Sequence, residues 1–417
     1  MRASVPPMGW NSWDCYGASV NEETVRRNAD YMAKHLKSFG WEYVVVDIEW
    51  YQPTAATHEY IPFAGLTMDE YGCLMPAVNR FPSAADGKGF RPLADYIHSL
   101  GLKFGIHIMR GLPRMAAHQH LPIRGSRYTC SDAANPADVC AWNPDMYGLR
   151  SEHPAAKDYY DQLFRLYAEW GVDFVKCDDI AREYPRCARE IELISEACAG
   201  CGREIVLSLS PGPAPLDRAE HLKKYANMWR ITDDFWDEWP LLLGMFERAE
   251  KWCIHAGPGH WPDADMLPVG ALRQCYPEHP RGNWTQFTQA EQRTMMTLWC
   301  MMRSPLMVGG ELTKNDPFTL ALLTNEKLLK IETDTVAARP LFRDERSCVW
   351  CAYTGDGRRY VAAFNLSDEP QKLRVTPDLM EMKPRRYCEL WTDRSSDGLF
   401  PEANLCPHDV AVWEITV

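Results

Sequence analysis

Polar and charged side chains end several short apolar runs along this chain of 417 residues. One carboxylate at the end of a predicted strand is more often a helix cap or an ion-pair partner than a catalyst. Five strands with such ends are difficult to explain as caps. Carboxylates that converge at one end of a sheet can bind a metal ion or a substrate with many hydroxyl groups. Few histidines or cysteines lie at metal-ligand spacing near these carboxylates. The pattern favours a sugar-like substrate and no metal. The polar strand-end residues are Asp47, Glu49, His107, Arg110, Lys176, Asp178, Arg230, Asp234, Asp263 and Asp265.

Two of these ends hold the residue types of a glycosidase. Lys176 and Asp178 share one face of a strand, as do Arg230 and Asp234. The lysine favours an ionised Asp178, as a nucleophile requires, whereas an acid/base carboxyl needs a raised pKa, which partial burial beneath a loop would give Asp234. Retaining hydrolysis uses two carboxyl groups roughly 5 Å apart. We predict that Asp178 is the nucleophile and Asp234 the acid/base.

The elements that position these residues alternate between β-branched runs and amphipathic helices, as in a parallel sheet. Helical spacing is clear in residues 22–39 and 157–170, and eight strand–helix units fit an α/β fold, a (β/α)8 TIM barrel. The irregular stretch 111–150 follows the third strand, and we expect it to roof the pocket with Trp142, Asn143 and Asp145. The predicted strands are residues 5–10, 43–50, 103–109, 173–178, 204–209, 228–233, 259–265 and 298–308.

After Thr324 the pattern changes to short alternating strands separated by Gly, Asp and Pro turns. These strands predict a C-terminal antiparallel β-sandwich, so we divide the chain into a barrel domain, 1–324, and a sandwich domain, 325–417. The sandwich is a candidate surface for a homo-oligomer. The predicted strands are residues 348–353, 360–365, 371–375, 387–392 and 410–417.

Composition excludes some partners. The net charge of −12 argues against nucleic acid, which binds clustered Lys and Arg. No run of eighteen apolar residues and no apolar leader is present, so we expect a cytoplasmic protein that does not contact membranes. The fifteen scattered cysteines fit reduced, buried thiols, and this interpretation covers Cys198 and Cys201, whose C-x-x-C spacing lacks a second metal-binding pair.

The chain resembles glycoside hydrolase family 27, the α-galactosidase and α-N-acetylgalactosaminidase family. The resemblance spans essentially the whole chain, and several separate motifs in the family's order make chance agreement very improbable. It implies the same barrel and sandwich, a retaining exo-glycosidase activity on a terminal galactose-like sugar, and no cofactor. The motifs are PPMGWNSWDCYG, YVVVDIEWY, NRFPSAADG, GLKFGIHI, WGVDFVKCDD, WRITDDFWDEW, AGPGHWPDADML and LLTNEKLLKIETD.

The resemblance also assigns residues. The family's K-x-D nucleophile motif corresponds to Lys176 and Asp178, and its acid/base aspartate, four residues after an arginine, corresponds to Asp234 after Arg230. The substrate-binding residues that we expect are Trp13, Asp47, Ile48, Glu49, His107, Arg110, Lys176, Ser210, Arg230, Asp265 and Met266.

Departures from the family's pattern bear on the substrate. α-Galactosidases have two consecutive aspartates at the end of the second strand, which bind the 4- and 6-hydroxyls of galactose, and here the pair is Asp47 and Ile48. A buried hydroxyl without a partner costs about 1 to 3 kcal/mol. β-L-Arabinopyranose is α-D-galactopyranose without its C6 hydroxymethyl group, so the isoleucine favours β-L-arabinopyranosides, which some family members cleave.

Alternatives stay open at this point. Glu49 or Arg110 would replace the missing aspartate in an α-galactosidase. Ser210, at the position of a glutamate that faces the 2-substituent, is similar to the α-N-acetylgalactosaminidase pattern, although Pro211 and Gly212 do not match that subgroup well. A Schiff-base aldolase that uses Lys176 and a non-catalytic sugar-binding protein are alternatives of other classes.

Overall fold

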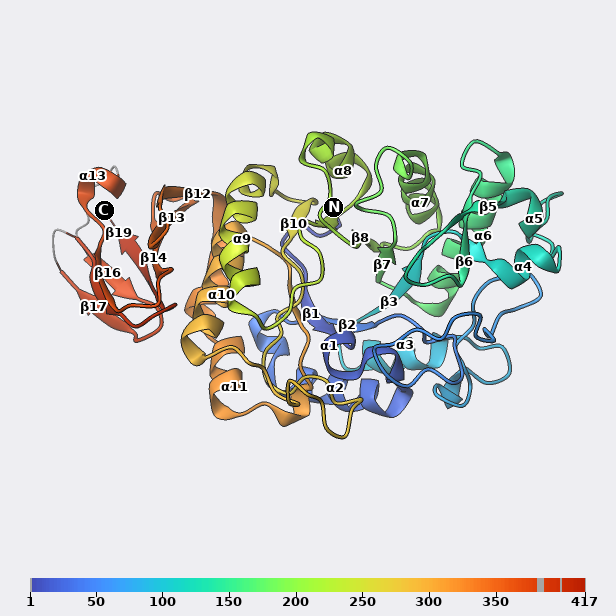
Figure 1. Ribbon diagram of the computed structural model, residues 1–417, viewed down its shortest axis with the longest axis horizontal. Helices are drawn as coiled ribbons and strands as arrows, with labels where there is room; N and C mark the ends of the chain where they lie inside the picture. Colours follow the sequence, from blue (N-terminus) through green and yellow to red (C-terminus); the bar gives the residue numbers. More distant parts are fainter. Residues whose placement is uncertain (1, 381–385, 398–399, 417) are drawn as a thin grey trace.

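The computed structural model describes residues 2–380, 386–397 and 400–416. Its parts lie in a row along the long axis: the C-terminal sandwich at one end, the barrel in the middle and a small lobe at the other end (Figure 1). Among the described helices, none is long and apolar enough to cross a membrane. The predicted barrel followed by an antiparallel sandwich is confirmed.

Eight parallel strands form the barrel in the order β10-β9-β8-β7-β3-β2-β1-β11. A bridge between Leu267, just after β10, and Val308 on β11 links the two ends of this sheet. The strands are β1 (Met8–Asn11), β2 (Tyr43–Val46), β3 (Lys103–Met109), β7 (Phe174–Asp178), β8 (Val206–Leu209), β9 (Met228–Arg230), β10 (Trp261–Asp263) and β11 (Leu306–Val308).

The eighth strand is shorter than predicted. Only Leu306–Val308 are extended, and the preceding apolar residues end the helix α10 (Gln289–Met302). A capping box between Thr288 and Glu291 begins that helix, and almost every side chain of its last three turns is buried. Because α10 is buried on all sides, its sequence lacks the polar face that would have identified it as a helix.

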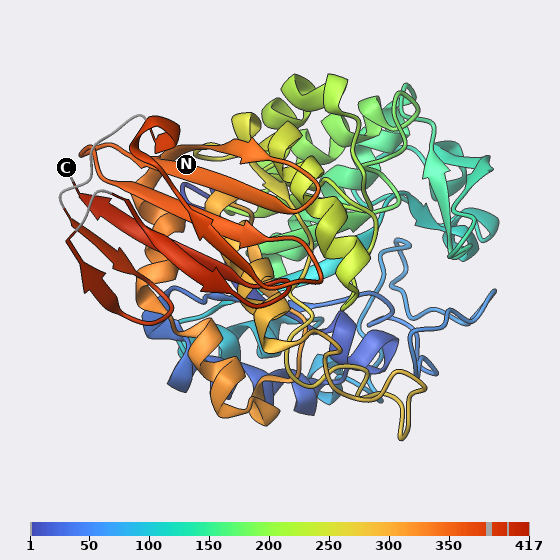
Figure 2. The same cartoon turned by 60° about the vertical axis from the view of Figure 1, so that its left-hand side comes forward.

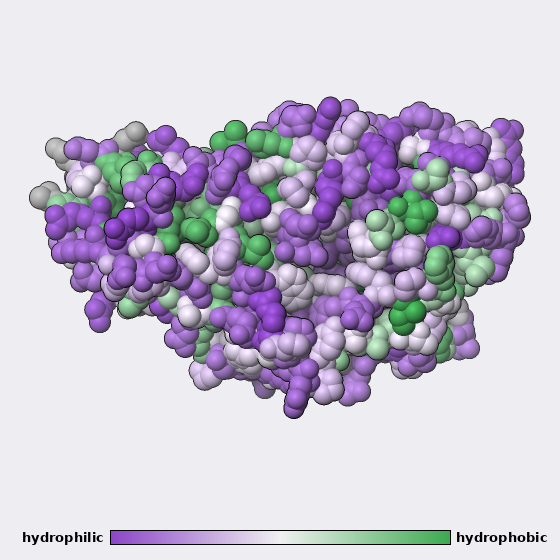
Figure 3. Space-filling model, in the orientation of Figure 1, coloured by the Kyte–Doolittle hydropathy of each residue, from purple (hydrophilic) through white to green (hydrophobic). Residues whose placement is uncertain are grey.

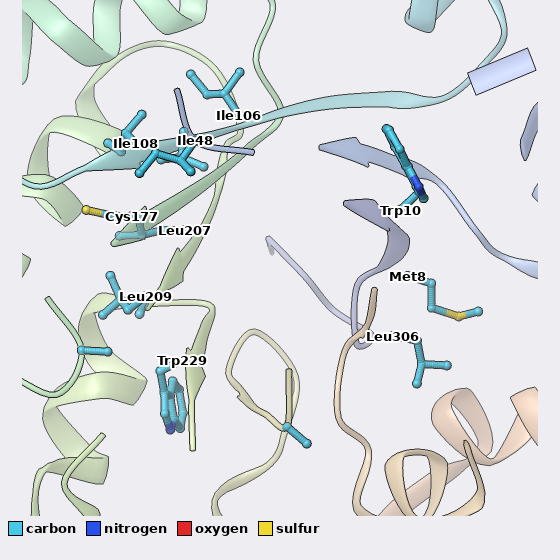
Figure 4. Close-up of a cluster of buried hydrophobic side chains, with 14 of the residues drawn as sticks. Met8, Trp10, Ile48, Ile106, Ile108, Cys177, Leu207, Leu209, Trp229 and Leu306 are labelled. Carbon is cyan, nitrogen blue, oxygen red and sulfur yellow. The ribbon is translucent and has the colours of Figure 1, made fainter. Parts of the chain in front are cut away.

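Side chains alternate between the two faces of the barrel sheet. Tyr43, Val45, Phe174, Val206 and Met307 belong to the cluster that fills the interior. The opposite face packs beneath the helices, and Figure 4 shows part of that layer. The remaining longer helices are α2 (Glu22–His35), α3 (Arg91–Ser99), α6 (Pro154–Trp170), α7 (Ala188–Gly200), α8 (Ala219–Tyr225), α9 (Trp239–Trp252), α11 (Pro317–Leu323) and α12 (Glu326–Asp334).

The stretch that we predicted to be irregular is a folded lobe. Residues 112–149 form a three-stranded sheet with the order β4-β6-β5 and two short helices. Long stretches without secondary structure are uncommon inside compact domains, and this lobe follows that tendency. Its elements are β4 (Leu112–Pro113), α4 (Arg114–His118), α5 (Cys130–Ala133), β5 (Ala134–Val139) and β6 (Met146–Leu149).

The sandwich packs a six-stranded antiparallel sheet, β12-β13-β14-β19-β16-β17, against the pair β15-β18. Figure 2 shows the long strands of the larger sheet side by side. Five of the strands, β13, β14, β15, β16 and β19, were predicted. The helix α12 precedes β12, the first strand of the sandwich. The elements are β12 (Thr335–Arg343), β13 (Ser347–Thr354), β14 (Arg359–Asn365), β15 (Gln371–Arg374), α13 (Pro377–Met380), β16 (Arg386–Glu389), β17 (Arg394–Ser396), β18 (Glu402–Leu405) and β19 (Val410–Thr416).

The central strands β13, β14 and β19 of the larger sheet are buried on both faces. One face carries Val349 and Val361 toward the β15-β18 pair, and the other carries Trp350 and Phe364 toward the barrel. Phe364 packs edge-on against Phe246 of α9, with ring centroids 5.0 Å apart. The barrel and the sandwich therefore share one continuous apolar core.

Candidate active site

A cavity of about 400 Å³ lies where several barrel strands end. This volume is typical of small-molecule sites. Figure 3 shows the surface hollowed over the barrel, with mostly hydrophilic residues around the hollow. Most of the predicted site residues line the cavity: Trp13, Asp47, Lys176, Asp178, Arg230, Asp234, Asp265 and Met266. The other lining residues are Asp14, His58, Tyr60, Trp142, Arg182, Pro211, Asp233, Phe235 and Trp236.

Asp178 closes β7 at the bottom of this cavity. Its Oδ2 lies 2.8 Å from Nε2 of His107, and its Oδ1 accepts a 2.8 Å hydrogen bond from the backbone N–H of Asp179. Burial raises the pKa of Asp178, but the hydrogen bond and charge of His107 and the charge of Lys176 outweigh it, so the net shift is downward. The carboxylate is thus ionised and oriented, as a nucleophile must be.

His107 was predicted to bind substrate, and the structure places its ring against the carboxylate of Asp178. It is 1% exposed and lies beneath Asp178, outside the lining of the cavity. Its contact with Asp178 orients the carboxylate of that residue.

Replacing His107 by phenylalanine is expected to raise the pKa of Asp178, because the largest lowering contribution is removed. The acidic limb of the kcat/KM profile should move up by roughly one pH unit. Asp178 must be ionised to attack, so activity at low pH is lost first. His107→Gln, which keeps a donor, is the matched control and should shift the limb less. Equal profiles for all three proteins would contradict the assigned contact.

Lys176 lies two residues before Asp178 and faces the same cavity. Its Nζ is 3.0 Å from Oδ2 of Asp47, which also accepts a 2.8 Å hydrogen bond from Nδ2 of Asn11. Burial lowers the pKa of Lys176, but Asp47 and Asp178 raise it further than burial lowers it. A Schiff-base lysine needs a lowered pKa. The ion pair with Asp47, which favours the charged lysine, therefore opposes the aldolase alternative.

Arg230 forms ion pairs with the carboxyl groups of Asp234 and Asp265 on the other side of the cavity. Its guanidinium lies 3.1 Å from Oδ1 of Asp234 and 2.9 Å from Oδ1 of Asp265. The side chain of Asp234 is 60% exposed, so the expectation that a loop buries it is wrong. In the open pocket only a bound sugar would cover this carboxyl group. Next to it, Asp233 pairs with Arg182 at 2.5 Å on the rim.

An aromatic wall, which we define as Trp13, His58, Tyr60 and Trp142, forms one side of the cavity. Trp13 and Tyr60 stack with centroids 5.9 Å apart, and Tyr60 contacts Trp142 at 5.3 Å. His58 fixes the wall because its Nε2 lies 2.8 Å from the carbonyl oxygen of Trp13. Such a surface suits the C–H face of a sugar ring. His58 and Tyr60 were not predicted, because they lie in a loop after β2 where no strand pattern applies.

Glu49 was predicted to bind substrate, but it points away from the cavity. It is 3% exposed, and its Oε1 accepts a 3.0 Å hydrogen bond from Nδ2 of Asn143. Burial, followed by the charge of Asp145, raises the pKa of Glu49 to about 8. Asn143 and Asp145 were expected at the substrate, and they form this buried cluster instead, whereas Trp142 lines the cavity.

Glu49→Gln is expected to stabilise the protein at pH 8 and to change its stability little at pH 5. Because the folded pKa lies above the ordinary 4.5, the folded state binds the extra proton, and the wild-type free energy of unfolding falls as pH rises through about 8. The variant should gain on the order of a few kcal/mol at pH 8. Urea denaturation at both pH values measures it, with the exposed Glu59→Gln as the control. A gain that is equal at both pH values would contradict the buried proton.

Arg110, Ser210 and Ile48 also lie outside the lining of the cavity. Arg110 is buried in ion pairs with Asp138 at 2.7 Å and Asp179 at 3.0 Å, so it supports the end of β7. Ser210 is 1% exposed, and its neighbour Pro211 lines the cavity instead. Arg110 was assigned by residue type at a strand end, whereas Ser210 and Ile48 were assigned from the family resemblance. Neither kind of assignment fixes the direction of a side chain.

Ile48 points out of the barrel. It is 1% exposed and lies beside Ile106 and Ile108 in the layer beneath the helices (Figure 4). Strand parity explains this, because Tyr43, Val45 and Asp47 alternate inward and the next residue faces outward. Its effect on the cavity is therefore the absence of a carboxylate and not a direct apolar contact.

The two cysteines with C-x-x-C spacing, Cys198 and Cys201, are free thiols, and each contacts a nearby backbone carbonyl. Within the described ranges, no group of three His, Cys, Asp or Glu side chains is placed to hold a metal ion.

Comparisons with known proteins agree with this geometry. The family described as Alpha galactosidase A matches residues 145–334, and the Alpha galactosidase C-terminal beta sandwich domain matches residues 344–415. Alpha-galactosidase 3 from Arabidopsis thaliana is 27% identical over 427 aligned residues, which cover 99% of this chain and 82% of that protein.

Solved structures are more similar. A β-L-arabinopyranosidase of glycoside hydrolase family 27 from Geobacillus stearothermophilus is 53% identical, has a TM-score of 0.97, and covers 100% of this chain and 97% of its own. A variant of that enzyme has been solved with arabinose. A Bacillus halodurans protein, provisionally named an α-N-acetylgalactosaminidase, is 52% identical with a TM-score of 0.88, over 99% of this chain and 97% of its own.

Proposed function

Since the chain belongs to glycoside hydrolase family 27 and is a retaining glycoside hydrolase, we propose that its substrates are β-L-arabinopyranosides. The carboxylate pattern at the end of β2 carries this proposal. Asp47 is the acidic side chain of that strand end that reaches the cavity, and Asn11 and Lys176 already engage its Oδ2. A galactose ring would bring one more hydroxyl group, on C6, to a place with no second carboxylate.

The neighbouring aromatic wall supports the same substrate. A pyranose without a hydroxymethyl group presents a plain C5 methylene, which gains from apolar contact and leaves no hydroxyl unpaired. Identity of 53% to an arabinopyranosidase over the full chain points in the same direction.

In the mechanism that we propose, Asp178 attacks the anomeric carbon while Asp234 protonates the leaving oxygen. Asp234 then removes a proton from the water that releases the sugar, so the anomeric configuration is retained. Arg230 fits both steps because it pairs with Asp234 from 3.1 Å and can stabilise its ionised form after protonation of the leaving group. Asp47 and Lys176 are placed to hold ring hydroxyl groups.

Two other substrates are weaker candidates. The provisional name of the Bacillus halodurans protein favours N-acetylgalactosaminides. However, Ser210 does not line the cavity, and the rigid ring of Pro211 lies there in its place. An α-galactosidase would need a substitute hydrogen-bond partner for the 6-hydroxyl, and neither Glu49 nor Arg110 lines the cavity to supply one.

Initial rates with the p-nitrophenyl β-L-arabinopyranoside, α-D-galactopyranoside and N-acetyl-α-D-galactosaminide test the proposal. We expect the arabinopyranoside to have the highest kcat/KM, by about tenfold or more over the galactoside, which corresponds to one unsatisfied hydroxyl group. A higher kcat/KM for either other glycoside would overturn the proposal.

Ile48→Asp tests whether the missing carboxylate sets this preference. An unpaired carboxylate is costly beside Ile106 and Ile108, so it should turn toward the cavity and raise the galactoside-to-arabinopyranoside ratio of kcat/KM. Ile48→Leu is the control that keeps volume and polarity. An unchanged ratio would assign the preference to the aromatic wall instead.

We also propose a cytoplasmic location, which the free thiols of Cys198 and Cys201 support, since oxidising compartments favour disulfides. Thiol alkylation of protein taken directly from cells tests this. We propose in addition that the chain forms a homo-oligomer, and analytical ultracentrifugation tests this by measuring the mass of the protein in solution.

A further inference from the structure

Asp14 is a buried carboxyl group that the proposed mechanism does not use. It follows Trp13 on the short helix α1 (Trp13–Tyr16), is 1% exposed and lines the cavity. Its backbone is held in place by the N–H of Arg273, which donates to its carbonyl oxygen at 2.8 Å. Within the part of the chain that the structure describes, its Oδ2 has no hydrogen-bond partner.

The fold makes room for this group. A Cβ atom on Gly309, just after β11, would lie 2.0 Å from Oδ2 of Asp14, so the carboxyl group fills the space that a larger residue would occupy. A buried polar atom without a partner costs stability in the free protein. Such a cost at the wall of a cavity is typical of a group that finds its partner only when a ligand binds.

The charges around Asp14 do not supply that partner. Lys176 pairs with Asp47, and Arg230 pairs with Asp234 and Asp265, so both buried cations of the cavity are already engaged. Burial, followed by the charge of Asp265, raises the pKa of Asp14 well above its ordinary value. The charges of Asp234 and Asp237 raise this pKa further, and the charge of Lys176 lowers it only in part. A carboxyl group in these surroundings keeps its proton and has an O–H to donate.

We propose that Asp14 is a substrate-binding residue whose protonated carboxyl group donates a hydrogen bond to one ring hydroxyl of the bound sugar. Asp47, Asp178, Asp234 and Asp265 offer carboxylate acceptors, whereas each sugar hydroxyl also has an oxygen that accepts. Asp14 supplies the complementary donor. This inference rests on the proposed glycosidase function, but not on the choice between arabinopyranoside and galactoside.

The experiment compares wild type, Asp14→Asn and Asp14→Leu on the p-nitrophenyl glycoside that wild type prefers and on its 2-, 3- and 4-deoxy derivatives. Asparagine keeps a neutral donor, so kcat/KM should stay within about threefold of wild type. Leucine keeps the branched shape without the donor and should lower kcat/KM by about 10- to 100-fold. For one deoxy glycoside, the ratio of wild type to leucine variant should fall close to one.

Stability separates binding from a structural role. Because leucine removes an unsatisfied polar group, the Tm of the free Asp14→Leu protein should equal or exceed that of wild type. The proposal is overturned if the leucine variant keeps wild-type kcat/KM, if asparagine loses as much as leucine, if the ratio is the same for all deoxy derivatives, or if Tm falls together with activity. Failure of wild type to cleave any glycoside would instead overturn the proposed function.

Discussion

Asp178→Asn is expected to lower kcat for every glycoside by a factor on the order of 10⁴ or more, because no covalent intermediate can form. The amide has the size of the carboxylate, and its single oxygen can still accept one of the two hydrogen bonds, from the ring N–H of His107 or from the backbone N–H of Asp179, so the cavity should keep its shape. Binding should therefore survive. The increase in Tm on addition of L-arabinose measures this separately from turnover.

Asp178→Gly provides the positive control. Azide that enters the space left by the side chain would attack the anomeric carbon directly and give a glycosyl azide of inverted configuration, which nuclear magnetic resonance identifies. Retention of more than about one hundredth of the wild-type kcat by the asparagine variant would assign the nucleophile elsewhere. Equal loss of arabinose binding and of activity would show that the substitution disrupts the site.

Asp234→Asn should give a loss that depends on the leaving group. For alkyl or sugar leaving groups, kcat/KM should fall by about 10² to 10⁴, because general acid catalysis is lost. A dinitrophenyl glycoside needs little protonation, so its kcat/KM should fall far less. Its kcat should instead be limited by slow release of the glycosyl enzyme, and azide should accelerate that step.

Asp233→Asn is the matched control because it changes the adjacent carboxylate, which pairs with Arg182 on the rim. This variant should lose the same factor for all leaving groups and should not respond to azide. If Asp234→Asn also loses one constant factor across the series, the acid/base assignment is wrong.

The alternation of apolar strands and amphipathic helices was sufficient to predict the barrel, and two-residue periodicity was sufficient to place Lys176 with Asp178 in one cavity. Both patterns are local and regular. The C-terminal part of the eighth unit was harder, since α10 is buried on all sides and its sequence carries no polar stripe.

Periodicity fails where a strand ends. Glu49 and Asp179 have positive φ angles of 68° and 59°, and these turns redirect the chain, so residue type there does not indicate direction. Glu49 and Arg110 were assigned to the substrate because they are polar residues that follow a strand. Both belong to buried polar clusters instead. Parity alone would have turned Ile48 outward, since it follows the inward-facing Asp47 directly.

His58 and Tyr60 lie in the cavity because of contacts between distant loops. The ring of His58 stacks on Tyr276 with centroids 5.7 Å apart, although more than two hundred residues separate them. No local pattern encodes such a contact. Asp14 carried one weak signal, a charged residue directly after Trp13 in a motif that was already recognised.

The shared core of barrel and sandwich determines how the protein loses its structure. The barrel-facing layer of Trp350 and Phe364, the stacking of Trp239 on His408 at 3.7 Å, and the ion pair of Arg293 with Asp409 at 2.9 Å all cross the junction. Removing the sandwich would expose this layer to water, and an isolated barrel would be prone to aggregate. Heating should therefore produce one cooperative calorimetric transition for the whole chain, because neither part keeps its buried surface covered when the other unfolds.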